Sequence, residues 1–332
     1  HYPLRRQRQM CIRDRAKYDW LDASSLMREY NFGKRLMIKP IRKLIDALGT
    51  NPTFSDFLDF DLMSRGAIPS IEPIKNLTQF MPLSNTLPPA MRTNTFVIGD
   101  QLKILVDPSP KDMNEYRLLL DAIKDYQFDK MFITHHHGDH HQFAPDIAKA
   151  LNIPIYISKD SFERCMVVHG EDYFKDIEIC LTVDKDIVGT WRNKKVIVHA
   201  VPGHDEGQLA LASEGLEWCI VGDLFQGIGT VVVGGDEGDM TKYMESLQKI
   251  INLKPMCVIP SHGIALGGTN ILEKTLRHRT FREEQVLDLH HKGKDVEEIL
   301  KLIYFDLPKR LMPYARANIE SHLKKLKNEN RI

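Results

Sequence analysis

The stretch Thr134-His135-His136-His137-Gly138-Asp139-His140-His141 decides how the rest of this 332-residue sequence is interpreted. It holds five histidines and one aspartate, and it follows the apolar run Met131-Phe132-Ile133. Imidazole nitrogens and carboxylate oxygens are preferred ligands of zinc and related transition metals. A cluster of them directly after an apolar run is typical of a loop at a strand end, where side chains can converge. The stretch therefore predicts a metal site.

Three further strand ends carry a ligand-type residue beside a glycine. They are Gly203-His204, Gly222-Asp223 and His262-Gly263. Glycine lets the backbone turn sharply while one neighbouring side chain projects into a shared site. One such residue could be a structural accident. Three of them, together with the histidine stretch, predict a common site.

These positions supply seven candidate metal ligands: His135, His137, Asp139, His140, His204, Asp223 and His262. The set contains no cysteine, and seven ligands are too many for one structural zinc, which takes four. They suffice for two metal ions if one carboxylate bridges. We therefore expect a catalytic centre with two divalent metal ions, with Zn²⁺ as the expected metal.

The segments around these residues alternate between strand and helix patterns, which predicts an α/β fold. Strands are predicted at 77–83, 94–98, 103–106, 130–133, 153–157, 195–201, 209–212, 218–221 and 257–259. Helices are predicted at 115–126, 142–151 and 241–253. The strand at 103–106 ends in Asp107, a carboxylate that either caps the turn or takes part in the site.

The pattern His-x-His-x-Asp-His, completed downstream, resembles that of metallo-β-lactamase-fold hydrolases over about residues 74–268. The resemblance implies a four-layer αββα metallo-β-lactamase sandwich. It implies that one metal ion is held by His135, His137 and His204, and the second by Asp139, His140 and His262. It further implies that Asp223 bridges the two ions and that Asp107 supports the ligands without binding metal.

The same resemblance implies the chemistry. Two divalent ions lower the pKa of a bridging water to give a hydroxide nucleophile, and they polarise the scissile carbonyl or phosphoryl oxygen. Asp139 would also orient that hydroxide, so Asp139 and Asp223 are the predicted catalytic residues. We expect a zinc-dependent hydrolase that acts on an ester, thioester or lactone-type small molecule or on a phosphodiester.

The C-terminal segment has helical patterns and many charges. The stretch from His278 to Glu283, His-Arg-x-x-Arg-Glu, resembles the opening of the winged-helix-like tail in the β-lactamase-like protein 2 group. A capping-box-like start at Asp295 and a third helix with Ala315 and Ile319 on one face follow. Residues 283–332 contain 10 Lys and Arg against 9 Asp and Glu. This near-neutral charge favours a packing or substrate-lid module over nucleic-acid binding.

Two other activities remain open on the same residues. Single-stranded RNA cleavage is one known activity of the β-lactamase-like protein 2 group, so the partner could be single-stranded RNA instead of a small molecule. A mono-iron sulfur dioxygenase on the same fold retains a similar histidine set but uses one iron. Metal content separates this last activity from two-metal hydrolysis.

The residues after the motif depart from the family pattern. Many relatives continue with a small residue and two glycines, whereas His141-Gln142-Phe143 stand here. The following helix should therefore start differently, which weakens the case for glyoxalase-type thioester substrates. His136 and His141 are spare histidines, which we interpret as supporting or surface groups rather than ligands.

The composition is that of an ordinary soluble protein. Lys plus Arg and Asp plus Glu are equal at 45 each, so the net charge favours neither nucleic acid nor an anionic membrane. The five cysteines are scattered without Cys-x-x-Cys spacing, which favours a reducing compartment over a disulfide framework. With no long apolar run and no signal-peptide pattern, we expect a cytoplasmic protein that does not bind membranes.

The sequence predicts four segments. Residues 1–15 resemble translated sequencing-adapter strings and are interpreted as a non-native leader, with a native basic arm for RNA as the alternative. Residues 16–72 are predicted to form a helical extension, whose clearest apolar face is Ile41, Leu44, Ile45 and Leu48. Residues 73–270 form the predicted catalytic domain, and residues 271–332 the small all-α, winged-helix-like domain.

Overall fold

The computed structural model describes residues 21–37, 41–42, 44–45, 49, 68–227 and 229–332. The predicted leader, residues 1–15, lies outside the described residues, as do much of the predicted extension and its Leu48. Within the extension, helix α2 (Ala23–Asn31) begins after Asp22, whose carboxylate accepts a hydrogen bond from the Ser25 amide. The Tyr30 hydroxyl of α2 donates to the Glu72 carbonyl and so attaches this helix to the first strand.

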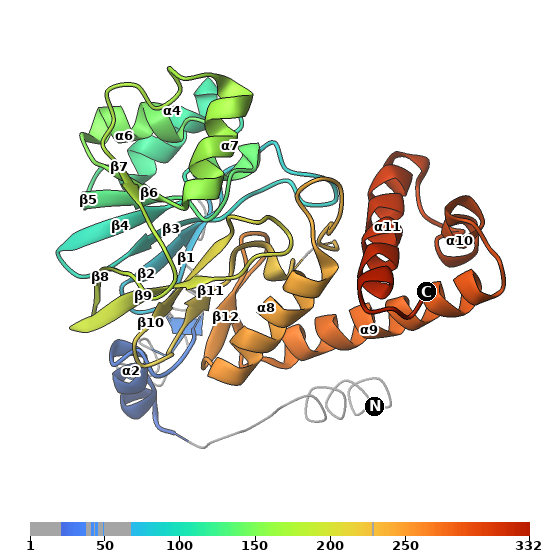
Figure 1. The fold of residues 1–332 in the computed structure, drawn as a ribbon. Coiled ribbons are helices and arrows are strands. Elements are labelled where there is room, and N and C mark those ends of the chain that lie inside the picture. Colours follow the sequence, from blue (N-terminus) through green and yellow to red (C-terminus); the bar gives the residue numbers. More distant parts are fainter. Residues whose placement is uncertain (1–20, 38–40, 43, 46–48, 50–67, 228) are drawn as a thin grey trace.

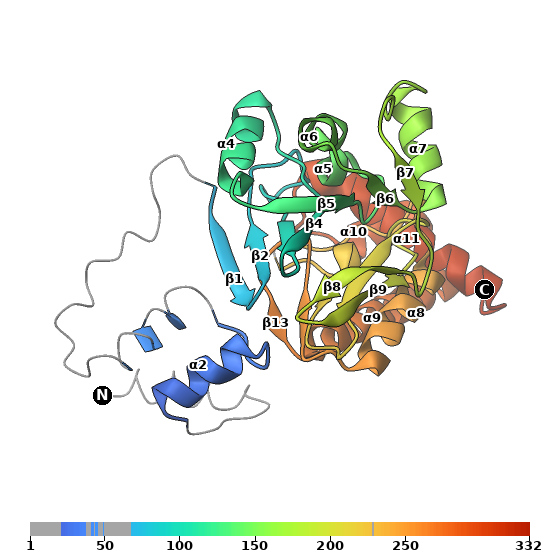
Figure 2. The ribbon, with the colours of Figure 1, turned by 90° about the vertical axis from the view of Figure 1, so that its left-hand side faces the viewer.

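Two β-sheets pack face to face at the centre of the molecule (Figures 1 and 2). The first sheet has the strand order β1-β2-β3-β4-β5-β6-β7, with strands β1 (Ser70–Ile74), β2 (Leu77–Phe80), β3 (Thr95–Ile98), β4 (Leu102–Val106), β5 (Gln127–Phe132), β6 (Ile155–Ile157) and β7 (Ile179–Leu181). The second has the order β13-β12-β11-β10-β9-β8, with β8 (Ile187–Trp191), β9 (Lys194–Ala200), β10 (Leu209–Ser213), β11 (Cys219–Ile220), β12 (Cys257–Ile259) and β13 (Leu266–Gly267).

Helices cover the outer face of each sheet. The first sheet carries α4 (Met113–Ile123), the short α5 (Gly138–His141), α6 (Ala144–Leu151) and α7 (Lys159–His169). The second sheet carries α8 (Met240–Leu253) and the first turns of α9 (Asn270–His291). Figure 1 shows the resulting order of layers, helix, sheet, sheet, helix, which confirms the predicted αββα sandwich.

Apolar side chains fill the three spaces between these layers. Phe96 and Phe132 of the first sheet and Trp191 and Trp218 of the second lie in the cluster between the sheets, all nearly inaccessible to water. Two further clusters lie between each sheet and its helices. Strand β3 is buried along its whole length, which explains why Phe96, Val97 and Ile98 are consecutive apolar residues without alternation.

Several of the strand ends at the site lie together because their strands are parallel neighbours, whereas His204 follows β9, which is antiparallel to both of its neighbours. Strand β4 pairs in parallel with β5, and β11 pairs in parallel with β12. Glycine is required at one of these ends, because a Cβ at Gly203 (φ 127°) would lie 2.1 Å from the Tyr243 backbone nitrogen on α8. The turn that directs His204 into the site therefore depends on close contact between the second sheet and α8.

The C-terminal tail consists of the second half of α9, α10 (Val296–Ile303), the short helix η2 (Lys309–Leu311) and α11 (Met312–Asn328). It has its own apolar core, which includes Val286, Ile299 and Ile319. Asp295 and Glu298 form the predicted capping box at the start of α10. Because α9 runs from the second sheet into this core, the tail and the sandwich share one continuous helix (Figure 1).

Several elements were not predicted from the sequence. Strand β1 begins at Ser70, inside the range predicted to be helical. Strands β7 and β8 and helix α7 also had no predicted counterpart. Within the part of the chain that the structure describes, no helix is both long and apolar enough to cross a membrane.

Candidate metal centre

The structure brings all seven candidate ligands to one end of the sandwich. Among the described residues, four groups have ligand-type atoms within 4.8 Å of one another, and three of them consist of candidate ligands alone: His135/His137/His204, Asp139/His140/His262 and His135/His140/Asp223. The fourth group joins His137 to His136, Asp205 and Glu237. Most members are buried, whereas the side chains of His137 and Asp139 are 29% and 16% exposed. These two side chains therefore mark the side of the centre that solvent reaches. Their role as metal ligands stays a prediction.

The first group is held by hydrogen bonds on the outer nitrogen of each ring. His204 Nδ1 donates to the Val232 carbonyl at 2.7 Å, and His137 Nε2 lies 2.9 Å from a Glu237 carboxylate oxygen. His135 Nδ1 lies 3.0 Å from the Thr134 hydroxyl. Carbonyl and carboxylate oxygens only accept hydrogen bonds, so the protons of His204 and His137 sit on these outer nitrogens.

The inner nitrogens of this group therefore face one another with lone pairs. His137 Nδ1 lies 3.0 Å from both His135 Nε2 and His204 Nε2. Two nitrogens bound tetrahedrally to one zinc ion at 2.0–2.1 Å would be about 3.3 Å apart. The three inner nitrogens thus fit a single small cation, and without one their lone pairs would repel one another.

The second group has the same arrangement. His140 Nδ1 donates to Asp107 Oδ2 at 2.8 Å, and His262 Nδ1 donates to the Arg92 carbonyl at 2.9 Å. Their Nε2 atoms lie 3.8 Å and 3.5 Å from Asp139 Oδ2. His140 Nε2 is buried and has no hydrogen-bond partner among the described residues. Such an orphaned nitrogen fits a metal ligand better than a structural histidine.

Asp223 lies between the two groups. Its Oδ2 is 3.6 Å from His204 Nε2 and 3.4 Å from His262 Nε2, and its Oδ1 is 3.9 Å from His140 Nε2. Oδ1 is buried and lacks a hydrogen-bond partner within the described residues. Although burial opposes it, the nearby His262 and His140 hold the pKa of this carboxyl far below its usual range. Asp223 therefore stays anionic and faces both groups.

Asp107 supports the centre from behind, as predicted. Its Oδ1 accepts the Thr134 amide proton at 2.8 Å, and its Oδ2 accepts both the Thr134 hydroxyl proton at 2.7 Å and the His140 proton. The side chain is fully buried. One carboxylate thus fixes the loop entrance and a ligand ring together, which is how outer-shell partners commonly orient metal ligands.

Burial and neighbouring charges divide the histidines by protonation. Burial lowers the pKa of His135 and, with the neighbouring His137, lowers the pKa of His204 to about 4. Both rings are therefore neutral at pH 7. Burial also opposes protonation of His140, but Asp139 and Asp107 outweigh it and raise its pKa to about 10. A cation bound at the second group would have to displace that proton.

The two spare histidines are supporting groups and neither lies on the surface. His136 is held between Asp205 at 2.5 Å and Glu237 at 3.2 Å. Burial opposes its protonation, but these two carboxylates raise its pKa to about 9. His141 Nε2 donates to the His136 carbonyl at 2.6 Å, and its Nδ1 lies 2.6 Å from the Tyr173 hydroxyl.

Two acidic residues of this network were not predicted from the sequence. Asp205 is fully buried and also accepts the Gly207 amide proton at 2.8 Å. Glu237 lies in a loop between Asp223 and α8 and contacts His136 and His137 together. Asp205 directly follows a candidate ligand, which was the available signal. Glu237 follows the apolar run Val231-Val232-Val233 and two glycines, but its contact with the two histidines depends on how the loop folds back on the centre.

The turn after the motif keeps a backbone that glycine favours. Phe143 has φ 65° immediately before α6, at a position where the family pattern has glycine. Its ring packs against Tyr116 with the centroids 5.6 Å apart. The loss of glycine has therefore not removed the left-handed conformation at this point, and the packing of the aromatic ring offsets part of its cost.

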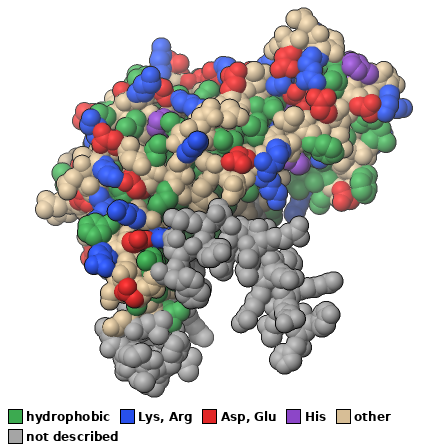
Figure 3. Space-filling view, turned by 90° about the horizontal axis from the view of Figure 1, so that it is seen from below, with side chains coloured by type: hydrophobic (Ala, Val, Ile, Leu, Met, Phe, Trp, Pro, Cys, Tyr) green, Lys and Arg blue, Asp and Glu red, His purple; other side chains and the backbone are tan. Residues whose placement is uncertain are grey.

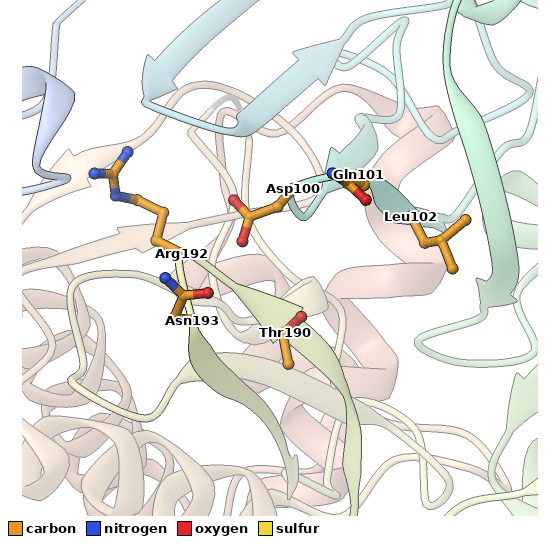
Figure 4. Close-up of a pocket in the computed structure, with 6 residues that line it drawn as sticks. All are labelled: Asp100, Gln101, Leu102, Thr190, Arg192 and Asn193. Atoms are coloured by element: carbon orange, nitrogen blue, oxygen red, sulfur yellow. The ribbon is translucent and has the colours of Figure 1, made fainter.

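A surface hollow of about 590 Å³ lies elsewhere and is lined by Asp100, Gln101, Leu102, Thr190, Arg192 and Asn193 (Figure 4). It sits beside the first residue of β4, whereas Asp107 follows the last residue of that strand. A five-residue strand spans about 17 Å. The hollow is therefore separate from the histidine cluster.

Comparison with known proteins identifies the family of the chain. The family model described as metallo-beta-lactamase superfamily matches residues 88–262, more than half of the sequence. The chain belongs to the metallo-beta-lactamase superfamily. A second model, described as beta-lactamase associated winged helix domain, matches residues 296–332. The resemblances to the metallo-β-lactamase fold and to the winged-helix-like tail are thus both confirmed.

Individual members of the superfamily are similar at modest identity. The beta-lactamase-like protein 2 homolog of Drosophila melanogaster is 28% identical, over 72% of this chain and 84% of that protein. The hydroxyacylglutathione hydrolase of Bdellovibrio bacteriovorus is 25% identical, over 49% of this chain and 60% of that protein. The atrochrysone carboxyl ACP thioesterase AacuM of Aspergillus aculeatus is also 25% identical, over 59% of this chain and 58% of that protein.

A solved structure shares the fold. A beta-lactamase domain protein from Burkholderia ambifaria superimposes with a TM-score of 0.69, at 19% identity, over 82% of this chain and 91% of that chain. At this identity the likeness concerns the fold alone. It extends over more of the chain than the superfamily model matches.

Proposed function

We propose that this protein is a hydrolase that uses two divalent metal ions, most simply Zn²⁺. The observation that carries the proposal is the position of Asp223, whose two oxygens face both ligand groups. A buried carboxylate with one unpartnered oxygen would be unfavourable as a purely structural feature. As a bridge between two ions it would be fully satisfied.

We propose the division of ligands that the family resemblance implies. His135, His137 and His204 would hold one ion, Asp139, His140 and His262 the other, and Asp223 both. When bound, two such ions would lower the pKa of a water molecule and polarise the substrate oxygen that gains negative charge. The outer hydrogen bonds keep each inner nitrogen free for this purpose.

Asp139 is the proposed catalytic residue that meets the reacting atoms. Its carboxylate is partly exposed, and Oδ2 accepts a long hydrogen bond of 3.3 Å from the Thr93 hydroxyl. Burial opposes ionisation, but His140 and His262 lower its pKa, so it is anionic at pH 7. Asp139 would therefore accept a hydrogen bond from the attacking water and orient it toward the substrate.

Carboxylic esters and thioesters are the proposed substrate class. Two similar proteins carry names of this kind, hydroxyacylglutathione hydrolase and ACP thioesterase. The left-handed turn at Phe143 also weakens the structural objection raised by the missing glycines, because one of the two positions keeps the backbone that glycine favours. These observations favour acyl transfer to water over phosphodiester cleavage.

The charge of the tail also argues against an extended phosphate contact. Five of the ten Lys and Arg in residues 283–332 pair with carboxylates: Lys292, Lys294, Arg316, Lys325 and Arg331. Basic and acidic side chains are intermixed over the described surface of the face in Figure 3. A protein that tracks a nucleic-acid backbone normally offers unpaired cations along a groove.

Single-stranded RNA cleavage remains the second candidate function. It is favoured by the similarity to the beta-lactamase-like protein 2 homolog, which covers most of both proteins. A mono-iron dioxygenase is less well supported, because the second ligand group is complete and its inner nitrogen has no other described partner. One metal ion per chain, identified as iron, would nevertheless favour it.

A hydrolysis screen with the zinc-loaded protein tests the proposal. Substrates would be an acyl-glutathione, an acyl-carrier-protein thioester, a lactone, a phosphodiester and a single-stranded RNA. We expect turnover of a thioester or ester that is lost in Asp139→Asn and retained in the surface variant Asp121→Asn. RNA cleavage without acyl hydrolysis would contradict the ester and thioester assignment and support single-stranded RNA cleavage instead. Inactivity on every substrate in a protein that holds two metal ions would contradict it.

A further inference from the structure

The loop of residues 229–239 makes two contacts with the candidate metal centre. The Val232 carbonyl accepts the proton of His204 Nδ1 at 2.7 Å, and the Glu237 carboxylate accepts that of His137 Nε2 at 2.9 Å. Both contacts place the proton on the outer nitrogen of a proposed ligand to the first ion. The position of this loop therefore decides which ring nitrogen of His204 and of His137 faces the proposed first ion.

Two side chains of the C-terminal helices hold this loop by its backbone. Arg279 on α9 donates Nη2 to the Val231 carbonyl at 2.5 Å, and Asn318 on α11 accepts the Val233 amide proton at 3.0 Å. Arg279 Nη1 also donates to Asn318 Oδ1 at 3.1 Å. The two side chains are only 2% and 6% exposed. Hydrogen bonds in such a dry environment are costly to break.

Backbone packing and a contact between Arg279 and an aromatic ring reinforce the arrangement. A Cβ at Gly234 would lie 2.4 Å from the Ala317 carbonyl oxygen, so the loop lies directly against α11. The Arg279 guanidinium also lies over the Tyr243 ring, 5.3 Å from its centroid. The Tyr243 hydroxyl in turn donates to the Leu224 carbonyl at 2.6 Å, one residue after the proposed bridging aspartate.

We infer that Arg279 and Asn318 are positioning residues of the metal centre. The inference rests on the proposed two-metal function and assigns the tail a role in building the site. By fixing the backbone on both sides of Val232, the two residues hold its carbonyl where it orients the His204 ring. Without them the ring could turn or exchange its proton between nitrogens, and the first ion would be bound more weakly.

Cobalt(II) titration of the metal-free full-length protein, followed by visible absorption, tests this role. The wild type should bind two ions. Asn318→Ala removes the acceptor for both Val233 and Arg279. We expect this variant to lower the affinity for one of the two cobalt ions by about 10-fold or more. Asn318→Asp keeps the acceptor oxygen and should restore most of the affinity.

Two further variants separate positioning from general damage to the tail. Gly234→Ala pushes the loop away from α11 without altering a tail side chain, and it should weaken the same ion even if Asn318→Ala does not fold. Glu283→Gln is the matched control, because its partners His322, Lys325 and Arg331 all belong to the tail. It should lower stability and leave both cobalt affinities unchanged.

The outcomes are distinct. Wild-type affinity for both ions in folded Asn318→Ala and Gly234→Ala would overturn the positioning role and leave the proposed function intact. An equal loss in Glu283→Gln would also overturn it, because the effect would then reflect loosening of the whole tail. A wild type that binds no cobalt would overturn the positioning role and the proposed function together.

Discussion

Asp107 Oδ2 lies 2.8 Å from His140 Nδ1, inside a region that water does not reach. The carboxylate follows β4 and the histidine follows β5, so the parallel pairing of two strands creates this contact. It connects the fold to the chemistry, since the same aspartate also holds the backbone of the loop that enters the histidine stretch. The contact gives the first prediction.

Asp107→Asn should lower the affinity for the second metal ion, the one assigned to His140, by about 10- to 100-fold. The variant is close in shape, and asparagine tolerates the positive φ of 47° at this position. It would replace an acceptor oxygen with an NH₂ group, so His140 or Thr134 would lose its partner. Chelator competition for zinc measures the change, with Asp121→Asn as an exposed control. Equal zinc affinity in a folded Asp107→Asn protein would refute the role.

His141→Ala should lower the free energy of unfolding by roughly 1–3 kcal/mol while the protein keeps two metal ions. Two hydrogen bonds are lost, to the His136 carbonyl and to the Tyr173 hydroxyl. Burial lowers the pKa of His141 to about 4, so the wild-type ring is neutral and makes these hydrogen bonds without carrying a charge. Urea denaturation and elemental analysis of the same sample report the two properties. A fall to one metal ion would make His141 part of the centre.

Phe143→Gly should be more stable than Phe143→Ala by about 1 kcal/mol. Both variants lose the contact with Tyr116, but only glycine relieves the left-handed backbone at φ 65°. The pair therefore isolates backbone strain from packing. Thermal denaturation of both proteins measures the difference. Equal stability would mean that the turn relaxes to another conformation.

The stability supplied by Glu283 should disappear in acid. Burial opposes ionisation of this carboxyl, but hydrogen bonds from His322 and Lys325 outweigh it and lower its pKa from 4.5 to about 2. A pKa that is lower in the folded state stabilises the protein fully above pH 4.5, and this contribution is lost as the pH falls from 4.5 toward 2. It amounts to roughly 1–3 kcal/mol.

Comparison of wild type with Glu283→Gln checks this sign. Urea denaturation followed by circular dichroism should give a large difference in stability at pH 7 that shrinks steadily below pH 4.5. The pairs around Glu283 lie within the tail, so the loss should be seen there first. A stability difference that stays constant from pH 7 to pH 3 would contradict the assignment.

The position of the site was predictable because its residues follow short apolar runs. His204, Asp223 and His262 each follow a strand of the second sheet and have a glycine as neighbour, a signal that depends only on local sequence. Parallel pairing of β11 with β12 then places the ends that carry Asp223 and His262 side by side. Local patterns of this kind are independent of long-range contacts, so the sequence alone could indicate that these seven side chains lie near one another. Their role as metal ligands stays a prediction.

The supporting contacts could not be predicted for the opposite reason. Glu237 lies in a glycine-rich loop, and its contact with His137 depends on how α9 and α11 hold that loop. The Val232 carbonyl offers no side-chain signal. Strand β8 was missed because Gly189 interrupts its five residues and its buried positions do not alternate regularly. Such features follow from tertiary packing.

Metal content per chain tests the central claim most directly. Elemental analysis of the purified wild type and of Asp223→Asn, each with its hydrolytic rate on the same ester or thioester, is the measurement. We predict two divalent ions per wild-type chain, with fewer than two in Asp223→Asn and the activity lost. Full hydrolytic activity in a wild type freed of metal, or two ions and full activity in Asp223→Asn, would contradict the two-metal centre.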